Sequence, residues 1–175
     1  MLRRLSIRNV VLIDKLDLDF RDGLSVLTGE TGAGKSILLD SLGLALGARA
    51  DSGLVRQGAA QAVVTASFEP ADLAPIAALL GESGLDHDPS EPLTIRRLVK
   101  ADGGSRAYVN DQPASAGLLR ELGALLVEIH GQHDDRGLLN PRGPRALLDS
   151  FARAATGAVA AAHRALRDAE DALAA

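Results

Sequence analysis

The sequence predicts an α/β lobe with a mixed β-sheet, followed by a helix that begins a coiled coil. Three observations carry this prediction. Strand-like segments stand before and after a glycine-rich segment, that segment leads directly into residues with helical periodicity, and an alanine-rich, charge-laced stretch starts at residue 151. We therefore expect one lobe over residues 1–150 and the start of a coiled-coil arm over residues 151–175.

Three strands are expected before the first helix. Residues 2–7 and 11–20 have the composition of strands, and the second of them alternates apolar with acidic side chains. Residues 21–23 form a turn, after which residues 24–28 alternate again and predict a short buried strand. Residues 37–45 then carry apolar side chains at helical spacing, which predicts the helix.

The rest of the lobe alternates between strands, short helices and turns. Turn residues mark the connections, because Gly, Pro, Asn, Asp and Ser favour the backbone conformations that turns need. In chain order we expect a strand at 62–68, a helix at 73–80, a surface loop at 82–92, a hairpin of strands 93–99 and 105–109, a turn at 110–113, a helix at 116–122 and a buried strand at 125–129.

Composition bounds the class of protein. With 175 residues and 46% hydrophobic content, the chain is long enough for a globular core, and the absence of cysteine excludes disulfides and cysteine-ligated metal sites. No apolar run approaches the length of a membrane span, so we expect no membrane contact and a cytoplasmic protein. The net charge of −4 supplies no general basic field for nucleic acid.

The glycine-rich segment has the sequence GETGAGKS and matches the phosphate-loop pattern G-x-x-x-x-G-K-[ST] at every fixed position. Its glycines allow successive backbone N–H groups to turn toward an anion at a helix N-terminus. Lys35 would reach the β- and γ-phosphates of a nucleotide, and the Ser36 hydroxyl would bind Mg²⁺. The alternative is a glycine-rich turn that caps an ordinary helix. The predicted nucleotide-binding residues are Gly29, Glu30, Thr31, Gly32, Ala33, Gly34, Lys35 and Ser36.

The segment from residue 151 has heptad spacing. Apolar residues follow one another at intervals of three or four, at Phe151, Ala155, Val159, Ala162, Leu166, Ala169 and Leu173. A solitary amphipathic helix is an equally good interpretation of so short a repeat. Neither a glycine cap nor a proline stop follows, so we expect the pattern to continue beyond Ala175.

A phosphate loop binds nucleotide, but hydrolysis also needs a carboxylate near the metal and a group that positions water. The nearest apolar run that ends in an acid is 125–128, with Glu128. We interpret it as an ordinary buried strand, because the acid is Glu rather than Asp. The chain also contains no LSGG segment, so it holds half of a catalytic site.

Five segments together resemble the N-terminal half of an SMC-like ATPase head, of the kind that acts in bacterial DNA double-strand-break repair. They are LSIRNVVLI at 5–13, LTGETGAGKSIL at 27–38, LGARA at 46–50, SRAYVN at 105–110 and IHGQH at 129–133, and they span nearly the whole chain. GETGAGKS and IHGQH are the specific ones. The resemblance implies an ATP-binding lobe with Mg²⁺, completed by the C-terminal half of the same protein, which supplies the missing acid and signature segment.

The resemblance also implies partners and further site residues. Two heads would sandwich ATP as a homodimer, and the full assembly would bind double-stranded DNA at ends or breaks on the nucleoid. Gln132 would be the Q-loop residue that contacts Mg²⁺ and the attacking water, which makes Lys35 and Gln132 the catalytic residues of this chain. Arg49 and Arg56 follow the first helix, where related heads carry arginines near the nucleotide. Solvated surface charge is the alternative for both.

Other interpretations stay open at this point. Gln132 could be a loop amide that bonds its own backbone. His130 and His133, with Asp134 and Asp135, could suggest a metal cluster, but they lack a further well-spaced ligand. At the level of the whole chain, the alternatives are the nucleotide-binding domain of an ABC-type transporter and a non-hydrolysing interaction module. The continuation from Gln132 into an NPR segment and a heptad helix argues against a transporter, and the intact Lys35 argues against a degenerate site.

Overall fold

The computed structural model describes residues 1–28, 34–129, 148–149, 152, 154 and 156–174. The chain divides into two compact units, Met1–Ile129 and His130–Ala175. Each unit is treated by itself below. The expected lobe boundary at residue 150 stays a prediction, because most residues between the units lie outside the described ones.

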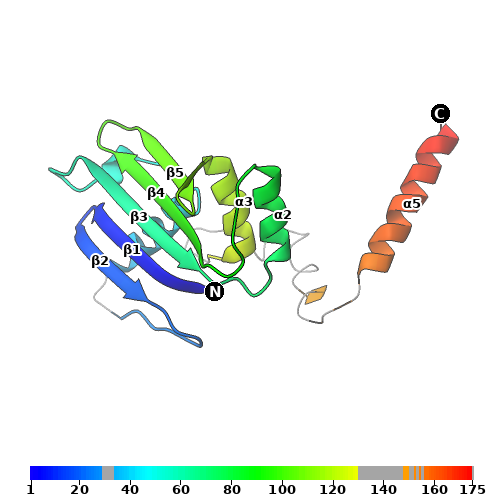
Figure 1. Ribbon diagram of the computed structural model, residues 1–175, viewed down its shortest axis with the longest axis horizontal. Helices are drawn as coiled ribbons and strands as arrows, with labels where there is room; N and C mark the ends of the chain where they lie inside the picture. Colours follow the sequence, from blue (N-terminus) through cyan, green and yellow to red (C-terminus); the bar gives the residue numbers. More distant parts are fainter. Residues whose placement is uncertain (29–33, 130–147, 150–151, 153, 155, 175) are drawn as a thin grey trace. The chain divides into compact units, whose positions relative to one another are not determined.

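The first unit is built on a six-stranded sheet with the order β2-β1-β3-β4-β5-β6 (Figure 1). Its strands are β1 Leu2–Val10, β2 Ile13–Asp19, β3 Gln61–Phe68, β4 Leu93–Lys100, β5 Ser105–Val109 and β6 Gln112–Ala114. The predicted β-segments at 2–7, 11–20, 62–68, 93–99 and 105–109 are confirmed with shifted ends, and β6 corrects the end of the turn expected at 110–113. Every pairing among the described strands is antiparallel, which corrects the expected mixed sheet.

Three helices of the first unit pack with this sheet, and the predicted helices are confirmed with shifted ends. They are α1 Lys35–Ala45, α2 Ala74–Glu82 and α3 Ala116–Leu126, and a short 3-10 turn, η1, covers Ser52–Leu54. Helix α1 contacts β1, β3 and β4, and α2 contacts α3. Figure 1 shows α2 and α3 next to each other at one end of the sheet.

The core lies between one face of the sheet and the helices. Strand β3 alternates strictly, so that Ala62, Val64, Ala66 and Phe68 are buried while their neighbours are not. The register pairs Val64 with Ile7 of β1, and both side chains are fully buried. The helices cover this face with fully buried side chains, among them Leu44, Ile76, Leu80, Leu119 and Leu122. This face therefore holds α1 firmly in place.

Two predicted strands are wrong. Residues 24–28 form no strand, and their apolar side chains are exposed, Leu24 by 94% and Val26 by 73%. A lone strand leaves its backbone groups unpaired, and no described strand lies beside this segment. Residues 125–129 are not a strand either, because α3 runs on to Leu126; a short apolar run fits a helix as well as a strand.

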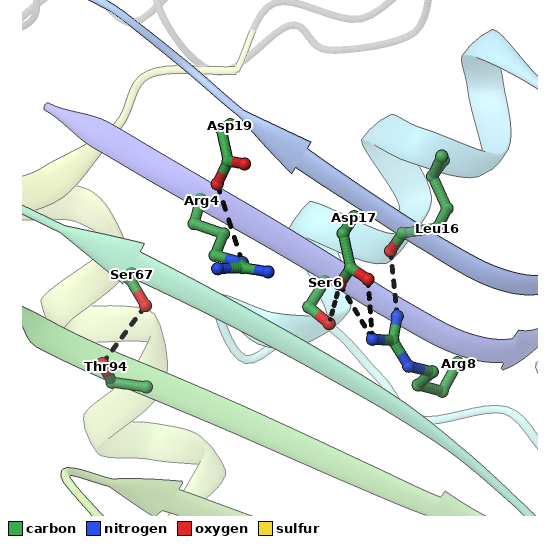
Figure 2. A network of polar contacts seen from close by, with 8 residues as sticks. All are labelled: Arg4, Ser6, Arg8, Leu16, Asp17, Asp19, Ser67 and Thr94. Atoms are coloured by element: carbon green, nitrogen blue, oxygen red, sulfur yellow. Dashed lines mark hydrogen bonds and ion pairs between the residues drawn. The ribbon is translucent and has the colours of Figure 1, made fainter.

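The other face of the sheet is polar, and its side chains pair with each other (Figure 2). The Arg8 guanidinium donates to both carboxylate oxygens of Asp17 at 2.9 Å, and the Ser6 hydroxyl donates to Asp17 at 2.7 Å. Arg4 lies 3.6 Å from Asp19. The hydrogen bond from Ser6, and then the one from Arg8, lower the pKa of the Asp17 carboxyl.

Replacing Asp17 by asparagine should therefore destabilise the protein in a pH-dependent way. A carboxyl whose pKa is lower in the folded state stabilises the fold above its unfolded-state pKa of about 3.9, and this contribution disappears as the pH falls through the folded value. Urea unfolding should show D17N less stable than wild type at pH 7, with the difference shrinking below about pH 4. Asp19→Asn is the control, because Asp19 is exposed and its pair with Arg4 is long. A difference independent of pH would contradict this account.

The second unit contains one described helix, α5, Gly157–Ala174. It begins later than the expected start at residue 151, directly after Thr156, a residue type favoured before a helix. Val159, Leu166 and Leu173, spaced as in a heptad repeat, are exposed by 65%, 56% and 89%. The predicted C-terminal helix is confirmed, and its apolar stripe is exposed to solvent.

Candidate phosphate-binding site

Helix α1 begins at the end of the GETGAGKS segment. Gly34 is its N-cap, with φ 137° and ψ −18°, a left-handed conformation that residues with a side chain rarely adopt. The Leu38 N–H donates to the Gly34 carbonyl at 3.1 Å and closes the first turn. Among the described residues, no side chain caps this end of the helix. Its first N–H groups and the positive end of its dipole are therefore available to an anion.

Lys35 and Ser36 are the first two residues of α1, and both are exposed. Their positions follow from how the rest of the helix is held. Leu42 and Leu44 are buried in the core, and the Ser41 hydroxyl donates to the Ile37 carbonyl at 2.6 Å, so that its buried oxygen has a partner. The buried half of α1 thus fixes the helix and with it the position of its exposed N-terminal turn.

The far end of α1 is fixed by close packing on α3. Gly47 follows the helix with φ 89°, and a Cβ there would lie 2.7 Å from both the Ala116 carbonyl oxygen and the Arg120 backbone nitrogen. From α3, Gly123 allows the same kind of approach, since its Cβ would lie 3.1 Å from the Cβ of Leu46. Two glycines therefore let the turn that follows α1, at Leu46 and Gly47, approach α3 closely.

The described part of the chain contains only some of the predicted site residues. It brings Gly34, Lys35 and Ser36 together at one helix start. Residues 29–33 and Gln132 lie outside the described residues, as do His130, His133, Asp134 and Asp135 of the alternative metal cluster. Within the described ranges, no group of three or more His, Asp or Glu side chains could hold a metal ion. Glu128 follows α3 and is exposed, so the buried strand expected around it is absent.

The two arginines after α1 have different surroundings. Arg49 is exposed. Arg56 lies beside the β1–β2 hairpin, where its backbone N–H donates to the Asn9 carbonyl at 2.9 Å and its guanidinium lies 3.3 Å from the Asp14 carboxylate. The neighbouring Val10 and Val55 form a β-bridge, which ties this segment to the hairpin.

The sequence analysis missed a basic pocket at the edge of the sheet. An open pocket of about 320 Å³ is lined by Arg97, Ser105, Arg106, Ala107, Tyr108, Pro113, Ala114 and Ala116. Arg97 is only 5% exposed, and burial, followed by the charge of Arg120, lowers the pKa of its guanidinium. The signal was present in the sequence, because alternation in a strand at 93–99 puts one of the adjacent arginines 96 and 97 on the core face.

Among the described residues, no helix has the length and apolar character that crossing a bilayer requires.

Comparison with known proteins places this site in a family. A family model described as AAA domain matches residues 4–91, half of the chain. The DNA repair protein RecN of Xylella fastidiosa strain 9a5c is 43% identical over 178 residues, which cover 99% of this chain and 32% of the relative. RecN of Haemophilus influenzae Rd is 42% identical over 154 residues, 87% of this chain and 27% of the relative. The chain thus spans about a third of the length of the curated relatives it matches.

A solved structure shows the same fold. It comes from work on ATP-driven dimerization and DNA-stimulated activation of SMC ATPases, and it matches with a TM-score of 0.57 at 22% identity, over 86% of this chain and 98% of that one. The predicted SMC-like α/β lobe is therefore confirmed as the fold of this chain.

Proposed function

Because the chain belongs to the AAA domain family and is similar over nearly its whole length to RecN proteins, we propose that it is the ATP-binding lobe of an SMC-like ATPase acting in DNA double-strand-break repair and recombination. One observation carries the proposal. The GETGAGKS segment leads straight into the uncapped N-terminus of α1, with Lys35 and Ser36 exposed in its first turn. The similar proteins favour this function over that of a transporter domain.

The residues at this helix start fit a nucleotide triphosphate with Mg²⁺. Uncapped N–H groups and the helix dipole bind the phosphate oxygens, and the Lys35 ammonium adds a positive charge beside the β- and γ-phosphates. The Ser36 hydroxyl and the Gln132 amide are the protein ligands that we assign to the metal. When bound, Mg²⁺ would neutralise charge on the phosphates. By the phosphate-loop pattern, residues 29–33 are the further nucleotide-binding residues that we propose.

The lobe is incomplete as a catalyst. Residues 24–28, directly before the phosphate loop, expose Leu24, Val26 and Leu27 by 94%, 73% and 48%. Such a run of apolar side chains favours burial against another segment. We propose that the C-terminal half of the same protein covers residues 24–28 and supplies the catalytic acid, and that two such heads then close on ATP.

The charges of this chain do not favour DNA binding by the lobe alone. The chain has a net charge of −4, and three arginines on the polar face of its sheet lie against carboxylates, Arg4 with Asp19, Arg8 with Asp17 and Arg96 with Asp111. These pairs reduce the positive charge that this face offers to the phosphates of DNA. We therefore propose that the complete head pair binds DNA, in the bacterial cytoplasm at the nucleoid.

Mixing the two halves of the protein tests the proposal. Chain 1–175 alone should bind fluorescent ATP with Mg²⁺ weakly and release no phosphate, and adding the C-terminal half should start slow hydrolysis. Val26→Asp should leave the fold and ATP binding of the isolated chain intact, because Val26 is exposed, yet it should prevent activation by burying a charge. Leu12→Asp is the matched control and should not prevent activation. Leu12 is similarly exposed, by 74%, but it lies in the β1–β2 turn, away from residues 24–28 in the sequence. Robust turnover by chain 1–175 alone would disprove the half-site.

A further inference from the structure

Arg97 is a buried guanidinium without an acidic partner among the described residues. It lies on β4 between the buried Ile95 and Val99, and therefore on the core face of the sheet. Its side chain is 5% exposed and donates one hydrogen bond, from Nη2 to the Ser105 hydroxyl at 3.1 Å. Its Nε is buried and has no hydrogen-bond partner.

The neighbouring Arg96 also has a buried Nε without a hydrogen-bond partner among the described residues, but its guanidinium has an acidic partner. Arg96 faces the opposite side of the sheet, where its guanidinium donates to the Asp111 carboxylate at 2.8 Å and lies 4.6 Å from the centre of the Tyr108 ring. A buried charge costs free energy unless an opposite charge and hydrogen bonds compensate it. Arginine does not escape this cost by losing its proton, because its pKa lies far above neutral. Among the described residues, Arg97 therefore has an N–H donor without an acceptor and a buried positive charge without an opposite charge.

Further positive groups surround the same space. Arg97 and Arg106 both line the open pocket, and α3 begins at its wall with Ala116. The Ser115 side chain caps α3 by accepting from the Leu118 N–H, so the remaining first-turn N–H groups and the helix dipole add positive potential. Arg120, one turn along α3, lies close enough for its charge to act on Arg97. No carboxylate lines the pocket among the described residues.

We propose that this pocket is an oxyanion-binding site, distinct from the phosphate loop, in which Arg97 is the principal ligand. The ligand carries a phosphate or carboxylate group, whose oxygens accept from the Arg97 Nε and from the guanidinium nitrogens, as such groups do in two-point contacts. Two sources can supply this chemistry. One is a small free oxyanion, and the other is an Asp or Glu side chain from the rest of the longer protein.

The test uses inorganic phosphate on chain 1–175 that carries Lys35→Ala, so that the phosphate loop contributes little. Phosphate should shift the Arg97 Nε–Hε signal in an NMR spectrum saturably, whereas chloride at equal ionic strength should not. Arg97→Met, which lacks this signal and is followed by the phosphate dependence of its Tm, should bind phosphate roughly tenfold or more weakly, the effect of one charge-assisted contact. Arg96→Met is the matched control and should keep the phosphate response, because Arg96 lies on the other face.

Stability gives a second readout. Without phosphate, Arg97→Met should have a Tm equal to or above that of the parent chain, because an apolar side chain replaces an uncompensated buried charge. Phosphate should raise the Tm of the parent only. If Arg97→Met does not fold, Arg120→Gln, an exposed substitution, should weaken the phosphate response severalfold. The proposal would be overturned if phosphate moved the Arg97 signal no more than chloride does, or if it raised the Tm of Arg97→Met as much as that of the parent.

The same titration on the full-length protein distinguishes the sources. If a carboxylate of the remaining chain occupies the pocket, full-length protein should show no phosphate shift at Arg97 while chain 1–175 does. If the ligand is a free oxyanion, both should respond. Because these phosphate titrations use a chain that carries Lys35→Ala and the ATP titration uses the intact phosphate loop, a failure of one proposal leaves the other standing.

Discussion

Lys35→Ala should abolish measurable ATP binding by chain 1–175. The ammonium is the one side-chain charge of the described residues that we place against the β- and γ-phosphates, and the helix N-terminus alone offers only partial charges. Losing a charge-assisted contact costs about 1.5–3 kcal/mol, or roughly a 10- to 150-fold weaker affinity. Since ATP binding by a half-site is already weak, this loss makes the affinity too low for the titration to measure. Titration of fluorescent ATP measures the effect.

Lys15→Ala is the control for this experiment. Lys15 is also an exposed lysine, but it lies on β2, so its removal changes the net charge equally without touching the start of α1. It should leave ATP affinity unchanged. Equal losses in the two variants would mean that ATP responds to net charge alone, and unchanged binding by Lys35→Ala would show that α1 does not hold the triphosphate.

Gly47→Ala should be the most damaging small substitution in the described part of the fold. Its Cβ would meet the backbone of α3 at 2.7 Å, and its φ of 89° is strained for any residue with a side chain. Strain of about 1–2 kcal/mol and overpacking of about 1–3 kcal/mol add to a loss of roughly 2–5 kcal/mol in the free energy of unfolding. Because neither backbone segment can yield alone, α1 and α3 must move apart. Urea denaturation followed by circular dichroism measures the loss.

Gly58→Ala separates the two causes. Gly58 has a similar φ of 85°, but a Cβ there would meet nothing within 4 Å. This variant should therefore lose only the backbone strain, about 1–2 kcal/mol. If Gly47→Ala were no worse than Gly58→Ala, the close approach of α1 and α3 would not limit stability.

The local sequence pattern was enough to predict an element where the element depends mainly on the segment's own residues. Strands β3, β4 and β5 were predicted from the alternation of residues 62–68 and 93–99 and from the hairpin turn between 93–99 and 105–109. Alternating apolar and polar side chains are what a strand needs when one face of its sheet is covered. Residues 24–28 have the same alternation and form no strand. A strand also needs neighbours for its backbone groups, and none of the described strands lies beside it.

The same division applies to the functional residues. The phosphate-loop pattern by itself determined that Lys35 and Ser36 stand at a helix start, because the pattern encodes a local turn and the helix that follows it. The sequence also determined that one of two adjacent arginines on a strand must face the core. Only the tertiary structure decided that Arg97 is that residue, that Ser105 is its hydrogen-bond partner, and that α3 brings Arg120 to the same place. These contacts join separate strands and a helix, and their geometry comes from packing between elements, which no single segment encodes.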